Sequence, residues 1–356
     1  MITKALLLNK SKYGYYLIIL SSALAALVHV ISKPMLENSE IVMPINPIVL
    51  AFLVYFIGGI FFTPIARKTD SISKFGKKDW MFMIAIGIAE VAALIAYFYG
   101  LSTSTAVNAS IFSNSEIVFA LVIGMMVFRE KLRIKECIPF SMIIIGMMAI
   151  PIGNTLFQNN FSLGEILAGD LLIILSGILY GIDITLCKYV GDKFDARRVI
   201  QIVSFVCAAV AISLIVVFQI PMDVDLMQLP SILVLSILGT GMSTLFFLMA
   251  LKFIGTMRTV LLYSTTSIFG VFFSGLFLAE VITVMDILSL VLVMTGIVML
   301  RNRFSGNKKH QDKEWITSSN NSPRKRIARR KNHRYKTSIL DRIQDEVIFR
   351  RWIGAG

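Results

Sequence analysis

Apolar stretches about 20 residues long recur along the whole chain and are separated by short polar segments. Each stretch is long enough to cross a hydrocarbon layer roughly 30 Å thick as an α-helix. The ten stretches are approximately 14–32, 47–65, 80–101, 106–127, 137–152, 169–189, 198–219, 231–251, 259–278 and 285–300. The pattern therefore predicts an all-α polytopic membrane protein with ten transmembrane helices.

The first five stretches resemble the last five. Leu17-Ile18-Ile19-Leu20-Ser21 recurs as Leu172-Ile173-Ile174-Leu175-Ser176, and Phe119, Glu130 and Gly146 recur as Phe269, Glu280 and Gly296. Because five crossings is an odd number, the second copy is expected to lie inverted in the membrane. Inverted repeats are typical of secondary transporters, which bind substrate near the bilayer midplane between the repeats.

The repeat also predicts how the chain is divided. We expect an N-terminal segment at 1–13, a first five-helix repeat at 14–152, a linker outside the cytoplasm at 153–168, a second repeat at 169–303 and a tail at 304–356. Glu130 and Glu280 follow the fourth and ninth helices and are expected to organise the turn into the next helix.

Composition and charge agree with a membrane location. The chain of 356 residues is 56% apolar and only 16% charged, which leaves too little polar surface for a soluble globule. Lys and Arg collect in every second connection, at 67–78, 129–135 and 193–198, and are absent from the alternate ones. The positive-inside rule then places both chain ends in the cytoplasm, with the protein in the plasma (cell inner) membrane.

The tail differs in composition from the rest of the chain. From Arg301 onward it has 16 Lys or Arg against 5 Asp or Glu. Its basic cluster is expected either to contact anionic lipid head groups or to belong to a solvated, disordered tail, and nothing else in the chain supports nucleic-acid binding. The cluster consists of Arg324, Lys325, Arg326, Arg329, Arg330 and Lys331.

Carboxyl groups inside the predicted spans are the main candidates for a functional site, because a charge in hydrocarbon is costly and marks a pathway. Glu90 and Glu116 lie halfway along adjacent antiparallel helices, hence at one depth. If they face each other, repulsion and desolvation favour protonation, as a proton-linked switch requires. The alternative is structural: each carboxyl is protonated and bonds to a neighbouring serine, asparagine or backbone carbonyl.

Further polar residues extend this candidate pathway. Asp183 lies in the sixth helix, and Tyr97 and Tyr180 are aromatic neighbours of carboxylates, an arrangement that suits amine ligands. His29 is a candidate proton carrier. The polar patch that contains Asn114 in the fourth helix is mirrored in the ninth by Tyr263 and Thr266. Ordinary packing is the alternative for the histidine and the tyrosines.

Enzymatic chemistry has no positive signal in the sequence. The three cysteines have no metal-ligand spacing, and the chain contains no phosphate-binding glycine loop and no nucleophile elbow. We therefore expect no catalytic residues, no metal site and no cofactor.

The order of several motifs resembles the EamA-type transporters of the drug/metabolite transporter superfamily. The resemblance covers roughly 14–303 and departs from the family pattern at Ile117, where the family commonly has proline, and at Thr266, where it has glutamate. The motifs are Glu116 to Ala120, Phe128 to Leu132, Gly169 to Lys188, Leu238 to Gly255, Leu278-Ala279-Glu280 and Gly296 to Arg301. The resemblance implies alternating-access transport, often export, of amino acids, other metabolites or drugs.

The sequence thus predicts a secondary active carrier, an exporter of a small organic metabolite such as an amino acid or amine, with protons as the favoured coupling ion. Its cavity is expected to be lined by helices one, three, four, six, eight and nine. A non-transporting sensor or scaffold that acts through the basic tail is the alternative, and a channel is a third reading. Both a monomer and a homodimer stay open.

Overall fold

A computed structural model describes residues 2–37, 43–67, 75–128, 138–139, 141–146 and 163–299, and all regular secondary structure within them is helical. The basic tail with its cluster from Arg324 to Lys331, most of the predicted linker, Glu130 and half of the predicted fifth helix lie outside these residues. The predicted number of ten helices therefore stays a prediction.

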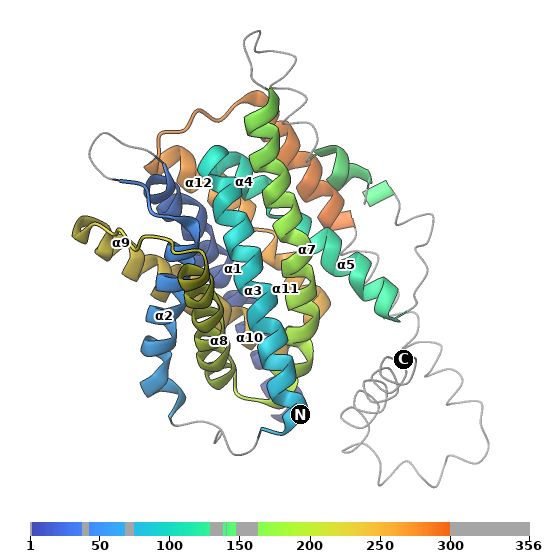
Figure 1. Ribbon diagram of the computed structural model, residues 1–356. Helices are drawn as coiled ribbons and strands as arrows, with labels where there is room; N and C mark the ends of the chain where they lie inside the picture. Colours follow the sequence, from blue (N-terminus) through green and yellow to red (C-terminus); the bar gives the residue numbers. More distant parts are fainter. Residues whose placement is uncertain are drawn as a thin grey trace, which may run out of the picture.

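The first predicted repeat contains α1 to α5 and the helical residues 138–139 and 141–146, and the second contains the remaining elements (Figure 1). The first group is α1 (Ile2–Leu36), α2 (Pro47–Ala66), α3 (Lys77–Thr103), α4 (Ala106–Phe112) and α5 (Ser115–Phe128). The second is α7 (Leu163–Lys193), α8 (Ala196–Val217), η2 (Leu226–Gln228), α9 (Leu229–Val234), η3 (Leu235–Met242), α10 (Ser243–Ile254), α11 (Thr256–Tyr263), α12 (Thr266–Phe277) and a last helix, Val284–Met299.

Seven described segments are long and apolar enough to cross a membrane, namely 13–36, 47–66, 77–103, 168–187, 196–217, 226–254 and 258–277. Large apolar side chains such as Ile60, Val216 and Phe272 are more than half exposed on the outside of this helical body. An apolar outer surface is what contact with lipid requires. The described part of the chain is therefore a polytopic membrane protein.

The fourth and ninth predicted helices are each broken in two, which the sequence analysis did not predict. The breaks lie at Ser113-Asn114, between α4 and α5, and at Ser264-Thr265, between α11 and α12. At each break, side chains donate hydrogen bonds to backbone carbonyls three residues earlier, as in Ser113 to Ser110 (2.8 Å) and Thr265 to Leu262 (2.8 Å). Such bonds compete with the helical pattern and favour a turn.

The eighth predicted helix is also irregular. Its segment η3 is a π-helical stretch, wider than an α-helix, between α9 and α10. Its sequence includes Gly239-Thr240-Gly241, and the Thr240 hydroxyl donates to the Leu235 carbonyl five residues earlier (2.9 Å). Glycine lowers the cost of an altered backbone, and π-helical turns are frequent at functional sites.

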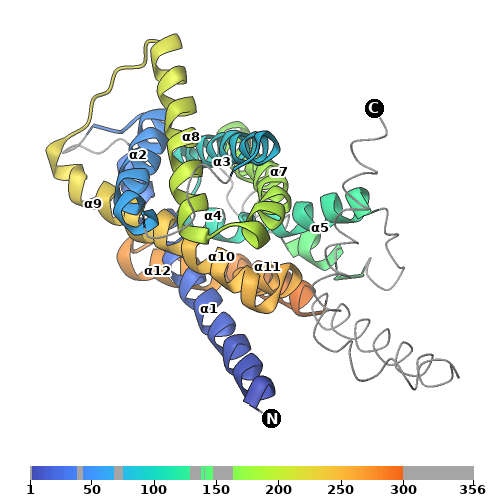
Figure 2. The same ribbon diagram turned by 90° about the horizontal axis from the view of Figure 1, so that it is seen from below.

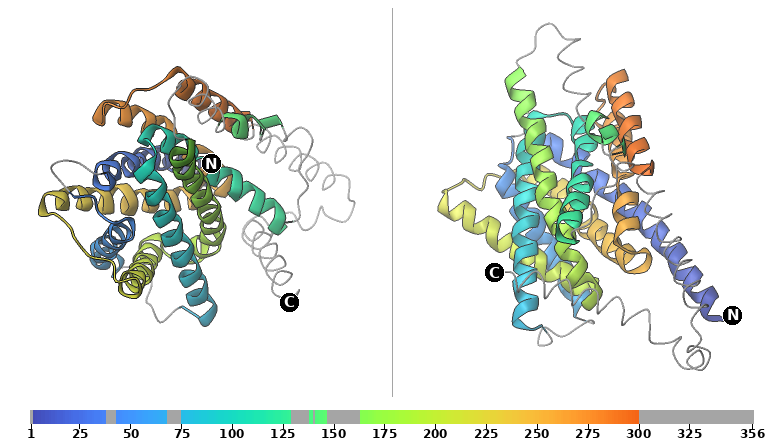
Figure 3. Two further views of the ribbon diagram at one scale, coloured as in Figure 1. Left: turned by 45° about the horizontal axis from the view of Figure 1, so that its top comes forward. Right: turned by 90° about the vertical axis from the view of Figure 1, so that its right-hand side faces the viewer.

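The most extensive packing joins helices from different repeats: α3 with α7, α2 with α8 and α1 with α10. Figure 2 shows α2, α3, α7 and α8 grouped on one side, with α10 and α11 passing beneath them. In Figure 3, the N-terminal end of α1 extends beyond the rest of the body. At the α3–α7 contact, a Cβ on Gly169 would lie 2.8 Å from the Gly100 carbonyl oxygen, so only glycine permits this close approach.

Candidate substrate cavity

A cavity of about 150 Å³ lies among the helices. Side chains from α1, α2, α3, α5, α7, η3, α10, α11 and α12 line it, together with Ser113 at the α4–α5 break. The helices that the sequence analysis expected all contribute, and α2 is an addition. Eight of the nine predicted pathway residues line the cavity: His29, Glu90, Tyr97, Glu116, Tyr180, Asp183, Tyr263 and Thr266.

Three carboxyl groups face this cavity, from α3, α5 and α7. Glu90 and Glu116 line the same cavity, and Asp183 joins them because α7 packs along α3. Among the described residues, no Lys or Arg lines the cavity. The cavity is therefore acidic.

Four tyrosines, Tyr55, Tyr97, Tyr180 and Tyr263, contribute aromatic surface to the same cavity. Tyr55 of α2 was missed by the sequence analysis, although a tyrosine in the middle of an apolar span is a polar signal of the same kind as Tyr97. Its side chain is 4% exposed, and it lines the cavity together with Glu90. Tyr55 thus adds a polar hydroxyl to the space that the carboxyls face.

His29 and Tyr97 join α1 to α3 at the cavity wall. The His29 Nδ1 atom is hydrogen bonded to the Tyr97 hydroxyl. The His29 ring is 5% exposed, and its other nitrogen, Nε2, is buried without a hydrogen-bond partner within the described residues. The pair therefore fixes the orientation of Tyr97 and leaves one imidazole nitrogen unsatisfied.

Asn114 does not line the cavity, in contrast to the prediction. Its amide donates hydrogen bonds to the Ser267 hydroxyl (2.6 Å) and the Ile111 carbonyl (3.0 Å), and its side chain is 1% exposed. The turn that breaks the fourth helix directs Asn114 toward α12 instead of inward. Its role in the structure is to link the two broken helices across the repeats.

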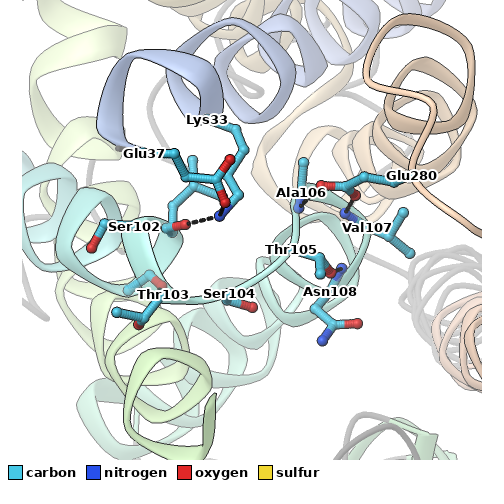
Figure 4. A network of polar contacts seen from close by, with 12 residues as sticks. Lys33, Glu37, Ser102, Thr103, Ser104, Thr105, Ala106, Val107, Asn108 and Glu280 are labelled. Atoms are coloured by element: carbon cyan, nitrogen blue, oxygen red, sulfur yellow. Dashed lines mark hydrogen bonds and ion pairs between the residues drawn. The ribbon is translucent and has the colours of Figure 1, made fainter. Parts of the chain in front are cut away.

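A polar network closes one end of the helical body (Figure 4). The two carboxylate oxygens of Glu280 accept hydrogen bonds from the backbone N–H groups of Ala106 and Val107, both at 2.9 Å. The expectation that Glu280 organises the turn into the next helix is therefore wrong, because it caps α4 in the other repeat. Nearby, Lys33 donates to the Leu101 carbonyl (3.0 Å) and pairs with Glu37 (2.5 Å).

A second set of polar contacts joins helices at the opposite end. Lys193 forms an ion pair with Asp79 (2.6 Å), and Lys252 donates to the Phe194 carbonyl. Arg198 of α8 donates to the Ala66 carbonyl at the end of α2 (2.7 Å). The cavity thus lies between two polar layers, one at each end of the helices.

Apolar helices around an acidic central cavity define the class of the protein as a polytopic helical membrane protein with an internal polar site. A family model described as the EamA-like transporter family matches the chain twice, over residues 12–151 and 167–302. The chain belongs to this family.

Two comparisons with individual proteins agree with this assignment. The chain is 26% identical over 305 residues to an uncharacterized transporter of Methanothermobacter thermautotrophicus, which covers 81% of this chain and 86% of that relative. A protein of known crystal structure superposes with a TM-score of 0.57 at 14% identity, over 82% of this chain and 96% of its own. The second likeness concerns the fold alone.

Proposed function

We propose that the protein is a secondary active transporter that exports a small amine-bearing metabolite, such as an amino acid or a simple amine, in exchange for protons. The observation that carries this proposal is the set of three carboxyls, Glu90, Glu116 and Asp183, in a cavity that no basic side chain among the described residues lines. A carboxylate removed from water needs a positive partner or a proton. A substrate ammonium group supplies that partner.

The aromatic walls support the same ligand class. Tyr97, Tyr180 and Tyr263 surround the space that the carboxyls face, and the faces of aromatic rings attract ammonium groups. The cavity volume is about 150 Å³. An engineered protein cavity of similar volume binds one molecule of benzene. The fitting substrate therefore has roughly six non-hydrogen atoms, which excludes bulky drugs.

Competition for the carboxyls supplies the coupling. An ammonium group and a proton each neutralise the same buried negative charge, so binding of one favours release of the other. Alternating access then requires the polar contacts at the two ends of the body, that of Glu280 with α4 and that of Lys193 with Asp79, to open in turn. We place the Lys193 end and both chain ends in the cytoplasm, on the charge bias of the loops.

Flux measurements in proteoliposomes test the proposal. The purified protein is reconstituted into liposomes, which are loaded with radiolabelled amines, amino acids or sugars of similar size. Flux is measured with and without a pH gradient. We expect saturable amine or amino-acid flux and counterflow, with Glu90→Gln, Glu116→Gln and Asp183→Asn each lowering pH-driven flux tenfold or more, since one buried charge pair contributes about 3–5 kcal/mol. Glu37→Gln, outside the cavity, is the control.

Two results would contradict the proposal. Unchanged pH-driven flux in all three carboxyl variants would remove the coupling mechanism. Flux that does not saturate and shows no counterflow would indicate a channel.

A further inference from the structure

A second, smaller pocket of about 20 Å³ lies beside the main cavity. The two spaces share Tyr55 and Glu90. On α3, the main cavity is lined by Glu90, Leu94 and Tyr97, whereas the small pocket is lined by Ile86 and Glu90, one helical turn toward the start of α3. Glu90 therefore stands between the two spaces, and the small pocket extends toward the end of the body that carries Lys193.

The polar lining of this side pocket consists mainly of acceptors. The Ser236 hydroxyl donates its proton to the Val54 carbonyl (2.5 Å), and the Thr240 hydroxyl donates to the Leu235 carbonyl (2.9 Å). The lone pairs of both hydroxyl oxygens stay available. Both residues belong to the π-helical segment η3, so the wide turn that the sequence did not predict creates this part of the lining.

Ser204 of α8 and Thr244 of α10 complete the polar lining, and neither hydroxyl makes a hydrogen bond within the part of the chain that the structure describes. Ser204 is 7% exposed. Both hydroxyls are therefore free to bond a small molecule held in the pocket. The arrangement therefore calls for a small molecule that accepts from Ser204 and donates to the carboxylate of Glu90 and to a lone pair of Ser236 or Thr240.

The geometry points to a binding site for one water molecule in this side pocket, held by Glu90 and Ser204 together with the hydroxyls of η3. A pocket needs roughly 10–15 Å³ to hold a water, and a buried water typically makes about three hydrogen bonds. The side pocket has a volume of about 20 Å³, and Glu90, Ser204, Ser236 and Thr240 line it as the partners that we assign. The water site itself is argued from the pocket, but the effect of the water on substrate binding rests on the proposed function. With the water as a fixed partner, the Glu90 carboxylate directs its remaining lone pairs at the bound ammonium.

The charge beyond the pocket favours water over a metal cation such as Na⁺. Along α8, Arg198, Gln201 and Ser204 follow each other at helical spacing and share a face. The Arg198 guanidinium donates to Gln201 (2.6 Å), whose amide donates to the Thr63 hydroxyl (3.1 Å). A fixed positive charge on this side opposes a cation and leaves a neutral occupant unaffected.

Gly58 of α2 offers a direct way to empty the pocket. A Cβ at this position would lie 3.5 Å from the Ser236 hydroxyl oxygen and 3.9 Å from that of Ser204, which is ordinary van der Waals contact. Gly58→Ala therefore fills the space without moving its neighbours, and alanine suits a helix better than glycine. The matched control is Gly59→Ala, whose Cβ would meet the ring of Phe205, at 3.0 Å, outside the pocket.

The first arm of the experiment observes the occupant. An electron cryo-microscopy or crystallographic map that resolves other buried waters is expected to show one density peak between Glu90 and Ser204 in the wild-type protein and in Gly59→Ala, and none in Gly58→Ala. An empty wild-type pocket in such a map would overturn the inference. This arm does not depend on the identity of the substrate.

The second arm measures binding of the amine that is transported best, in buffers with Na⁺ or with K⁺. Gly58→Ala is expected to weaken amine binding roughly tenfold, the value of one hydrogen bond to a charged group. Ser204→Ala is expected to weaken it less, because the water keeps its other partners. Gly59→Ala should remain within about twofold of wild type, and an uncharged alcohol of the same size should bind Gly58→Ala and wild type equally.

The outcomes separate the two proposals. Equal amine binding by Gly58→Ala and wild type, or an amine affinity that falls when K⁺ replaces Na⁺, would overturn the water site. A wild-type protein that shows the water but transports no amine would instead overturn the proposed function.

Discussion

Glu280 provides the most direct test of the contacts between the repeats. Its carboxylate accepts two backbone hydrogen bonds of 2.9 Å at the first turn of α4, from Ala106 and Val107. Four N–H groups at a helix start have no partner in their own helix, and a negative charge there is favoured by the helix dipole. A hydrogen bond to a charged acceptor contributes about 1.5–3 kcal/mol. Since Glu280 is partly exposed, we use the lower value.

Two substitutions then give a graded result. Glu280→Gln keeps one accepting oxygen and loses the other, at a cost of about 1.5 kcal/mol, and Glu280→Ala loses both, at about 3 kcal/mol. At roughly 2 °C per kcal/mol for a chain of this size, the melting temperature of the purified protein in detergent should fall by about 3 °C and about 6 °C, respectively. Differential scanning fluorimetry with a thiol-independent dye measures this.

Glu37→Gln is the control at the same end of the body. Glu37 pairs with Lys33 (2.5 Å), but its side chain is 52% exposed, and exposed ion pairs contribute little. We expect a shift below about 1 °C. If both Glu280 variants have the same melting temperature as the Glu37 variant, the Glu280 carboxylate does not stabilise α4 and the reasoning is refuted.

Three further predictions concern other parts of the body. Asn114→Ala should lower the free energy of unfolding by about 1 kcal/mol, the usual scale of a hydrogen bond between membrane helices. The control Ser213→Ala, at an exposed position, should leave that free energy unchanged. Equal effects of the two substitutions in chemical denaturation would contradict the prediction. Ala279 has a φ of 51°, so Ala279→Gly should raise the melting temperature by relieving about 1 kcal/mol of strain, and a lowered value would show that no strain is present. In a variant with Cys187 as its single cysteine, the transported amine should slow labelling by a small membrane-permeant thiol reagent, since Cys187 lines the cavity; labelling at the same rate with and without amine would place the substrate elsewhere.

Helix positions could be predicted because the hydrophobic requirement of a membrane is nearly independent of tertiary structure. The predicted segment 80–101 corresponds to α3 (Lys77–Thr103), and 47–65 to α2 (Pro47–Ala66). The residues facing the cavity were predictable for a similar reason. Exposing a carboxyl or a tyrosine hydroxyl to lipid is costly, so these side chains in an apolar span face the protein interior. Glu90, Glu116 and Asp183 satisfy this rule, and their roles in transport stay predictions.

Local breaks and long-range partners could not be read from the same pattern. The turn at Ser113-Asn114 depends on side chains that bond to the preceding helical turn, and serine or asparagine also occurs within regular membrane helices. Depth along a helix also does not give its neighbours in the other repeat, so the sequence did not show that α7 brings Asp183 into the same cavity as Glu90 and Glu116. Glu280 shows the same limit, since its partner lies more than 170 positions earlier in the chain.

Packing across the repeat boundary has a consequence for how the duplicated gene could have evolved. Ser21 of α1 and Ser243 of α10 each donate a hydrogen bond to the other's backbone carbonyl, at 2.8 and 3.0 Å, and α2 with α8 and α3 with α7 are likewise mixed pairs. Each of these helix pairs is therefore a composite of both copies. A single copy on its own would leave one side of each pair uncovered, and in the fused chain a change on one side of a pair requires a matching change on the other.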